Sequence, residues 1–293
     1  GLWMLLYGMD LMRKGLEYSA KDKMESALLK MAGTPFKACI TGFIATMLVQ
    51  SSTAISVMSI GLVNARIMNL RQAIGILLGS NVGTCITVQI ISFDIIYFAL
   101  MAGFLGLLLT SLFKSKNLIN FGRGLIGFGI IFSGLKIMAV SFEPLQHASW
   151  FINLLHSLSH SDVLAVIAGT LASALLHSSA AATGIVMLLS KQNLLPLTTA
   201  IAVVMGNNVG TCITAVLASI KGSAAGKRVA LAHVLLNIVG VLLFLPLLTA
   251  FAWLIVLLSG DDISRQVANA HTLFNLISSM VAYPFIRYFA FIL

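Results

Sequence analysis

The chain is a succession of long apolar stretches separated by short polar links. An initial apolar run covers residues 1–12, and eight further stretches each hold 17 or more residues, the length at which an apolar helix begins to span a bilayer. No part of the chain reads as a soluble domain or a low-complexity linker. The pattern therefore predicts an all-α polytopic membrane protein. The eight stretches are 36–64, 73–91, 93–113, 124–140, 162–190, 198–220, 229–258 and 266–293.

Two of these stretches are too long for a single crossing. As one helix, residues 36–64 or residues 162–190 would each measure ~43 Å, whereas the hydrocarbon core of a bilayer is ~30 Å thick. As two arms of ~13 residues, each stretch reaches the middle of the membrane and returns to the side from which it entered. We therefore predict a re-entrant helical hairpin in each stretch.

The two predicted hairpins belong to an internal repeat. The segment 50–52 recurs as 177–179, and the segment 79–87 recurs as 206–214, always 127 positions later. Duplicated polar motifs inside apolar segments are typical of secondary transporters, whose substrate site lies between two repeats near the membrane midplane. We assign residues 1–113 to the first transmembrane repeat, residues 124–258 to the second, and residues 266–293 to an additional C-terminal transmembrane helix.

Composition and charge indicate the surroundings and the orientation. Charged residues make up 9% of the chain, against about 25% in soluble domains. With both hairpins re-entrant, 15 of the 18 Lys and Arg residues fall on one side, which the positive-inside rule assigns to the cytoplasm. This asymmetry favours a multi-pass protein of the inner (plasma) membrane, surrounded by lipid, over a protein that binds nucleic acid.

Three crossings separate the hairpins, so the repeats have inverted topology and their tips meet at mid-membrane. Whether the chain forms a homodimer is left open.

The predicted hairpin tips carry hydroxyl and amide groups. A pair of adjacent serines falls where each second arm begins, so unpaired N–H groups and the positive end of the helix dipole favour an anion there. The hydroxyls add hydrogen-bond donors. The alternative is that these hydroxyls only hold helices together, as is common in membrane proteins. The residues predicted to contact the substrate are Gln50, Ser51, Ser52, Thr53, His177, Ser178 and Ser179.

A second repeated motif lies in the middle of the stretches that follow the hairpins. In each copy, residues with amide and hydroxyl groups lie between two glycines, which are Gly79 and Gly83 in the first copy and Gly206 and Gly210 in the second. Because glycine allows a helix to unwind and to free carbonyl oxygens, we predict a glycine-interrupted transmembrane helix in each repeat and a Na⁺ site beside it. Close helix packing through the glycines is a compatible alternative. The predicted Na⁺ ligands, with no further metal and no organic cofactor, are Ser80, Asn81, Thr84, Asn207, Asn208 and Thr211.

The positions of the charged residues bear on coupling. The acids fall in links or at the ends of stretches, apart from Asp10 in the first apolar run, and Arg13 and Lys14 are assigned to a loop cluster. Without Lys or Arg at the tips, a bound anion is expected to need a co-bound cation, since an unpaired charge at the midplane is costly. This favours sodium-coupled symport. Proton coupling would have to pass through His177, the titratable side chain at a tip.

These motifs resemble those of the type II sodium-dependent phosphate cotransporter family, in its bacterial branch. The resemblance rests on Gln-Ser-Ser-Thr at 50–53, on the paired Gly-x-Asn-x-Gly-Thr motifs, and on Ala-His-x-Leu-x-Asn at 232–237 and 270–275. It implies sodium-coupled transport of inorganic phosphate by alternating access around the two tips. The chain departs from the family's Gln-Ser-Ser-Ser motif at Thr53 in the first copy and, in the second copy, at both ends of His177–Ala180.

Other functions remain open at the level of the sequence. Helix dipoles and hydroxyls hold any tetrahedral anion, so a transporter or channel for another oxyanion, such as sulfate, is an alternative, and so is transport in either direction. An intramembrane hydrolase that uses His177 and Ser178 is disfavoured, because adjacent residues do not face each other on a helix and no acid orients the histidine. The chain is therefore not expected to be an enzyme.

Overall fold

The computed structural model describes residues 1–31 and 33–292, and the side chains of residues 19–31, including those of Lys21, Lys23 and Lys30, lie outside the described residues. The described residues form helices and short connections, which confirms the predicted all-α class. The α-helices are α1 (Leu2–Met31), α2 (Pro35–Val49), α3 (Ser52–Asn64), α4 (Leu70–Ile91), α5 (Ile96–Leu112), α6 (Lys116–Phe142), α7 (Ser149–Ser159), α8 (Asp162–Leu176), α9 (Ser179–Lys191), α10 (Leu197–Ser219), α11 (Ala224–Phe244), α12 (Leu248–Ser259), α13 (Ile263–Ala282) and α14 (Ile286–Ile292). Short 3₁₀ segments are η1 (Pro144–His147), η2 (Leu245–Leu247) and η3 (Tyr283–Phe285).

Several of these helices are long and apolar enough to cross a membrane, so the chain is a polytopic membrane protein. They are α4, α10 and the longer segments Lys116–His147, Ala224–Ser259 and Ile263–Ile292. By contrast, α2, α3 and α9 are apolar helices of 13 to 15 residues. A helix of that size measures ~20 Å, short of the ~30 Å hydrocarbon core.

Two pairs of short helices, α2 with α3 and α8 with α9, have the same lengths and the same break. Each helix boundary of the second pair lies 127 residues after its counterpart. The first helix of each pair ends at a left-handed residue, Gln50 (φ 57°) or His177 (φ 52°), a conformation that stops a helix. The next residue, Ser51 or Ser178, accepts the N–H three residues ahead at 3.1 Å and so caps the following helix. The same short motif therefore produces the helix break in both pairs.

Glycines let α4 pack directly on α2, and α10 on α8. A Cβ at Gly79 would collide with the carbonyl oxygen of Cys39, and one at Gly206 would collide with that of Val166. Both α4 and α10 run through their glycines without interruption, which corrects the predicted glycine-interrupted helices. The physical reason is that each glycine removes a side chain from a contact between backbones. The helix keeps its own hydrogen bonds, and the motif allows the close packing.

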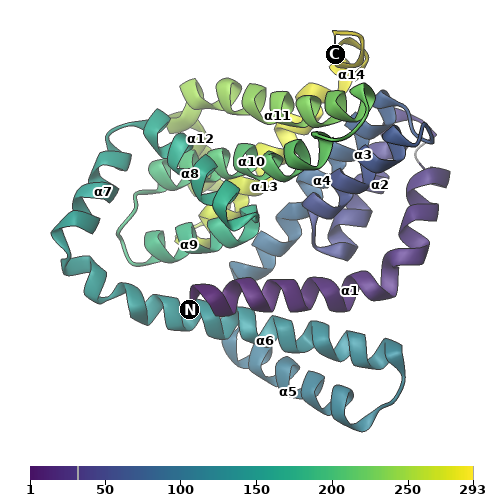
Figure 1. The fold of residues 1–293 in the computed structure, drawn as a ribbon. Helices are drawn as coiled ribbons and strands as arrows, with labels where there is room; N and C mark the ends of the chain where they lie inside the picture. Colours follow the sequence, from purple (N-terminus) through teal and green to yellow (C-terminus); the bar gives the residue numbers. More distant parts are fainter. Residues whose placement is uncertain (32, 293) are drawn as a thin grey trace.

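The helix α1 lies beside α6, with α5 on the far side of α6 (Figure 1). The two helices are antiparallel, because Gly8 approaches Gly127 whereas Gly15, further along α1, approaches Gly124. Both contacts bring backbone atoms within 3 Å of the position that a Cβ would occupy. The helix α1 thus also packs on α6 through contacts between backbones.

The helix α1 is longer than the apolar run that predicted it. It continues beyond residue 12 through Arg13 and Lys14, which both pair with Asp10 one turn earlier. Such pairs at a spacing of three or four residues stabilise a helix. Arg13 and Lys14 therefore lie within α1, and their assignment to a loop cluster was wrong.

Contacts between links gather the helix ends at two sides of the molecule. At one side, Asn64 at the end of α3 accepts the backbone N–H of Ser223 at 3.0 Å. At the other side, Lys191 Nζ lies 3.4 Å from Asp94 Oδ2, and Gln146 lies next to Gln192. The end of the first helix pair and the end of the second pair thus belong to different groups of links.

Candidate functional site

Two tips, residues 50–53 and residues 177–180, line one cavity of about 370 Å³. The remaining walls come from α1, α4 and α10, with Leu176 from the end of α8. Every residue predicted to contact the substrate lines this cavity. The full lining is Leu6, Met9, Asp10, Arg13, Gln50, Ser51, Ser52, Thr53, Thr84, Thr87, Leu176, His177, Ser178, Ser179, Ala180, Thr211 and Thr214.

The first residue of each tip contacts a threonine of the neighbouring long helix. Thr87 of α4 donates a hydrogen bond to Gln50 Oε1, and His177 Nδ1 lies 3.3 Å from Thr214 Oγ1 of α10. The two contacts are related by the shift of 127 residues. Histidine in place of glutamine therefore keeps the contact that joins the tip to α10. A contact to Thr214 differs from the histidine–serine contact that a hydrolase would require.

The serines of the tips have two different roles. Ser51 and Ser178 cap α3 and α9 through their side chains. Ser52 and Ser179 lie in the first helical turns, and no partner for either hydroxyl is found among the described residues. The caps thus bring two helix N-termini to the cavity wall, where the positive end of the dipole favours an anion. The following hydroxyls are available to a ligand.

The structure separates the six residues predicted to bind Na⁺. Thr84 and Thr211 line the cavity beside the tips. Ser80 lies outside it, with its Oγ 2.6 Å from Thr46 Oγ1, and Asn207 donates to Thr183 Oγ1 at 3.2 Å. Both Ser80 and Asn207 are buried. Two threonine hydroxyls, rather than the whole predicted set, are therefore brought to the cavity.

The repeated asparagines also lie outside the cavity lining. Asn81 donates to Asn237 Oδ1 at 3.2 Å, and its own Oδ1 lies 3.3 Å from His233 Nε2. Asn208 donates to the carbonyl oxygen of Val204, one turn earlier in α10, at 3.0 Å. Asn81 thus joins α4 to α11 through the Ala-His-x-Leu-x-Asn motif, whereas this bond of Asn208 stays within its own helix.

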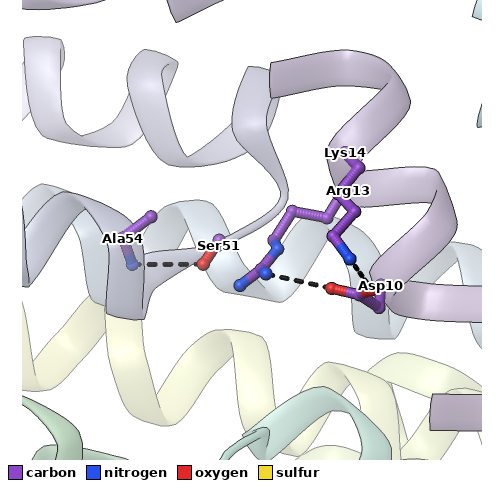
Figure 2. Close-up of polar contacts among 5 residues, drawn as sticks. All are labelled: Asp10, Arg13, Lys14, Ser51 and Ala54. Atoms are coloured by element: carbon purple, nitrogen blue, oxygen red, sulfur yellow. Dashed lines mark hydrogen bonds and ion pairs between the residues drawn. The ribbon is translucent and has the colours of Figure 1, made fainter. Parts of the chain in front are cut away.

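The cavity wall also contains a charged pair from α1. Arg13 Nη2 donates to Asp10 Oδ1 at 3.0 Å, and Lys14 Nζ lies 2.6 Å from Asp10 Oδ2. Figure 2 shows the guanidinium of Arg13 extending from α1 toward Ser51 in the first tip. The tips themselves contain no Lys or Arg, but α1 brings Arg13 to the cavity that they line, which was not predicted. The available signal was the spacing Asp-x-x-Arg-Lys, which places opposite charges on one helix face.

Comparison with known proteins identifies the family to which these elements belong. A model of the Na⁺/Pi-cotransporter family matches residues 4–140 and 145–279, which include nearly all of α1, both tips, α4 and α10. The chain belongs to the Na⁺/Pi-cotransporter family. Membership confirms the resemblance carried by the tip motifs and makes the chain a member of a transporter family.

Named relatives of this Na⁺/Pi-cotransporter family member are bacterial. An uncharacterized protein of Bacillus subtilis (strain 168), YqeW, is 37% identical over 247 residues, which cover 84% of this chain and 80% of YqeW. YjbB of Escherichia coli (strain K12), whose name assigns it provisionally to inorganic phosphate export, is 27% identical over 243 residues. That match covers 83% of this chain and 45% of YjbB, so the chain spans about half the length of that relative. No solved structure gives a significant match.

Proposed function

We propose that the chain transports inorganic phosphate by alternating access around the cavity between the two tips. The observation that carries the proposal is the convergence of two capped helix N-termini, each followed by an unpartnered serine hydroxyl, on one cavity of a Na⁺/Pi-cotransporter family member. Phosphate presents several acceptor oxygens, which suit donors arriving from two sides. The name of YjbB supports phosphate as the substrate, and because it refers to export, both directions need to be measured.

The proposal is tested with the purified chain in proteoliposomes. We expect saturable uptake and efflux of radiolabelled phosphate, competed by unlabelled phosphate and much less by sulfate. Transport of sulfate without transport of phosphate would contradict the proposed substrate. Flux that does not saturate with concentration would instead favour a channel.

The helix pairs are proposed to be re-entrant hairpins of inverted repeats. Three observations support this topology. The helices α2, α3 and α9 are short for a crossing, the antiparallel α1 and α6 begin the two repeats, and the ends of the two pairs join different groups of links. With Asn64 on the cytoplasmic side, the positive-inside rule is satisfied by Arg66 and Lys221 on that side as well.

Cysteine labelling tests this topology. In a cysteine-free background, cysteines at Arg66 and Lys221 are expected to react with an impermeant maleimide only from the cytoplasmic face. A cysteine at Lys191 is expected to react only from the outside. The contact between Asn64 and Ser223 supports a common face for Arg66 and Lys221. The contact between Lys191 and Asp94 joins Lys191 to a different group of links. Labelling of positions 66 and 191 from the same face would rule out the inverted arrangement.

Sodium is proposed as the coupling ion. The family description and the Thr84 and Thr211 hydroxyls at the cavity support it. Linkage requires that each ligand raise the affinity of the other by the same factor, so phosphate affinity should rise with Na⁺ and fall in choline at fixed pH. We expect Thr84→Ala and Thr211→Ala to weaken this Na⁺ dependence, because both side chains line the cavity. His177→Gln should leave it intact, since Gln50 makes the equivalent contact in the first repeat.

The proton-coupled alternative predicts the opposite result. Phosphate uptake would then be unaffected by replacing Na⁺ with choline in either protein, and the pH dependence of uptake would disappear in His177→Gln. That pair of results would reject sodium coupling and assign coupling to the histidine.

A further inference from the structure

The cavity between the tips carries a positive charge that comes from one helix. Asp10 and Arg13 line the cavity, and the Asp10 carboxylate is shared between Arg13 at 3.0 Å and Lys14 at 2.6 Å. Two cations on one carboxylate leave this group of three with one net positive charge. The side chains of Asp10 and Arg13 are 38% and 37% exposed, whereas that of Lys14 is 65% exposed and does not line the cavity. Of the two cations, Arg13 is therefore the one presented to a ligand.

The Arg13 guanidinium has donors beyond the one that Asp10 uses. Its Nη2 donates to Asp10, and its Nε is buried with no partner among the described residues. Figure 2 shows the guanidinium between Asp10 and Ser51. A guanidinium carries five N–H donors in a planar fork that matches the oxygen pairs of phosphate and carboxylate. The Nη1 of Arg13 has no partner among the described residues and belongs to a side chain that is 37% exposed and lines the cavity, so this donor is open to an oxygen-rich ligand.

We propose that Arg13 binds the oxyanion in the cavity and supplies its countercharge, with Asp10 as the positioning residue that holds the guanidinium at the wall. The inference rests on the proposed function only for the identity of the anion. One unit of the oxyanion's charge is then offset by the protein itself. A co-bound sodium ion has correspondingly less charge to compensate.

The geometry also makes the anion a bridge. Arg13 belongs to α1, which packs along α6, whereas the serine hydroxyls belong to the tips. An oxyanion held by both joins α1 to the two helix pairs.

Equilibrium binding of radiolabelled inorganic phosphate to the full chain in detergent tests the proposal. Loss of one charge-assisted hydrogen-bond partner corresponds to about a 10- to 150-fold loss of affinity, which we expect for Arg13→Gln. Arg13→Lys, which keeps the charge and loses the fork, should fall between Arg13→Gln and the wild type. The matched control is Lys14→Gln, which removes the same unit of charge from the salt bridge but no donor that reaches the cavity, so its loss of affinity should be much smaller than that of Arg13→Gln. Equal affinities of Arg13→Gln and the wild type, or equal losses in Arg13→Gln and Lys14→Gln, would overturn the assignment.

A measurement on the unaltered protein covers the case in which Arg13→Gln fails to fold. Phenylglyoxal modifies accessible arginines, and mass spectrometry of the peptides reports each site separately. We expect saturating phosphate to protect Arg13 from modification and to leave Arg66 unprotected. Modification of Arg13 at the same rate with and without phosphate would overturn the proposal.

The proposed substrate and the proposed role of Arg13 are contradicted by different results. If the wild type binds sulfate and not phosphate, the proposed substrate is wrong, and the same comparison of Arg13→Gln with Lys14→Gln made with sulfate still decides the role of Arg13. If the wild type binds phosphate and Arg13→Gln binds it equally well, the proposed function stands and the role of Arg13 is rejected.

Discussion

Replacing Ser52 or Ser179 by alanine is expected to lower phosphate affinity about 10- to 150-fold, because a hydrogen bond to a charged group contributes roughly 1.5 to 3 kcal/mol. Both hydroxyls line the cavity and find no partner among the described residues, so a bound anion is their natural acceptor. The double replacement should bring binding below detection at phosphate concentrations that saturate the wild type. Isothermal titration of the detergent-solubilised protein measures each value.

Ser56→Ala is the matched control for this prediction. Ser56 is buried in the same helix as Ser52, and its hydroxyl donates to the carbonyl oxygen of Ser52 at 2.8 Å rather than facing the cavity. Its replacement should change phosphate affinity less than about twofold. Ser51 and Ser178 are less informative, because removal of a helix cap costs ~1 kcal/mol of stability and would mix folding with binding. Equal, mild losses at positions 52, 56 and 179 would indicate that the serines only hold helices together.

Gly206→Ala is expected to destabilise the protein by about 1 to 3 kcal/mol or more, as overpacking of a close contact does. The new Cβ would overlap the carbonyl oxygen of Val166 and lie 2.9 Å from the backbone nitrogen of Thr170, and neither atom can rotate away. The helices α8 and α10 must therefore separate. Thermal unfolding in detergent, followed by size-exclusion of the heated sample, should show a lower midpoint. Gly79→Ala should lower the midpoint of thermal unfolding as well, since its Cβ would meet the backbone of Cys39 and Phe43 in the same way.

Gly61→Ala provides the contrast. This glycine lies within α3, and a Cβ there meets no atom within 4 Å. Because alanine is a better helix former than glycine by about 1 kcal/mol, the midpoint should stay the same or rise. A midpoint for Gly206→Ala as high as that of Gly61→Ala would mean that α8 and α10 are packed less closely than the structure has them.

The tips were predictable from the sequence because their structure is local. A left-handed residue followed by a serine cap is set by four or five neighbouring residues, and the second copy repeats the motif with the same spacing. The length and the apolar composition of each stretch likewise predicted the helices, since both are properties of a single segment. The placement of all seven predicted substrate contacts on one cavity required only that the two copies meet.

The remaining features depend on partners distant in the chain. Whether Gly79 unwinds a helix or admits a neighbour is decided by α2, which supplies the backbone against it. Asn81 is held by Asn237, 156 positions away, and no motif spacing encodes that pair. Arg13 was missed because the apolar run was taken to end before the first basic residue, whereas the salt bridge with Asp10 lets α1 continue past it.

The backbone contacts at Gly42 and Gly79, and their counterparts at Gly169 and Gly206, have a mechanical consequence. These backbone contacts hold α2 closely against α4, and α8 closely against α10. Each pair of helices has a tip at the cavity and a link away from it. A displacement of the tips is therefore expected to move the links as well. The distance between spin labels at residues 66 and 191 would therefore report the conformational change of the transporter, and neither label would alter the site itself.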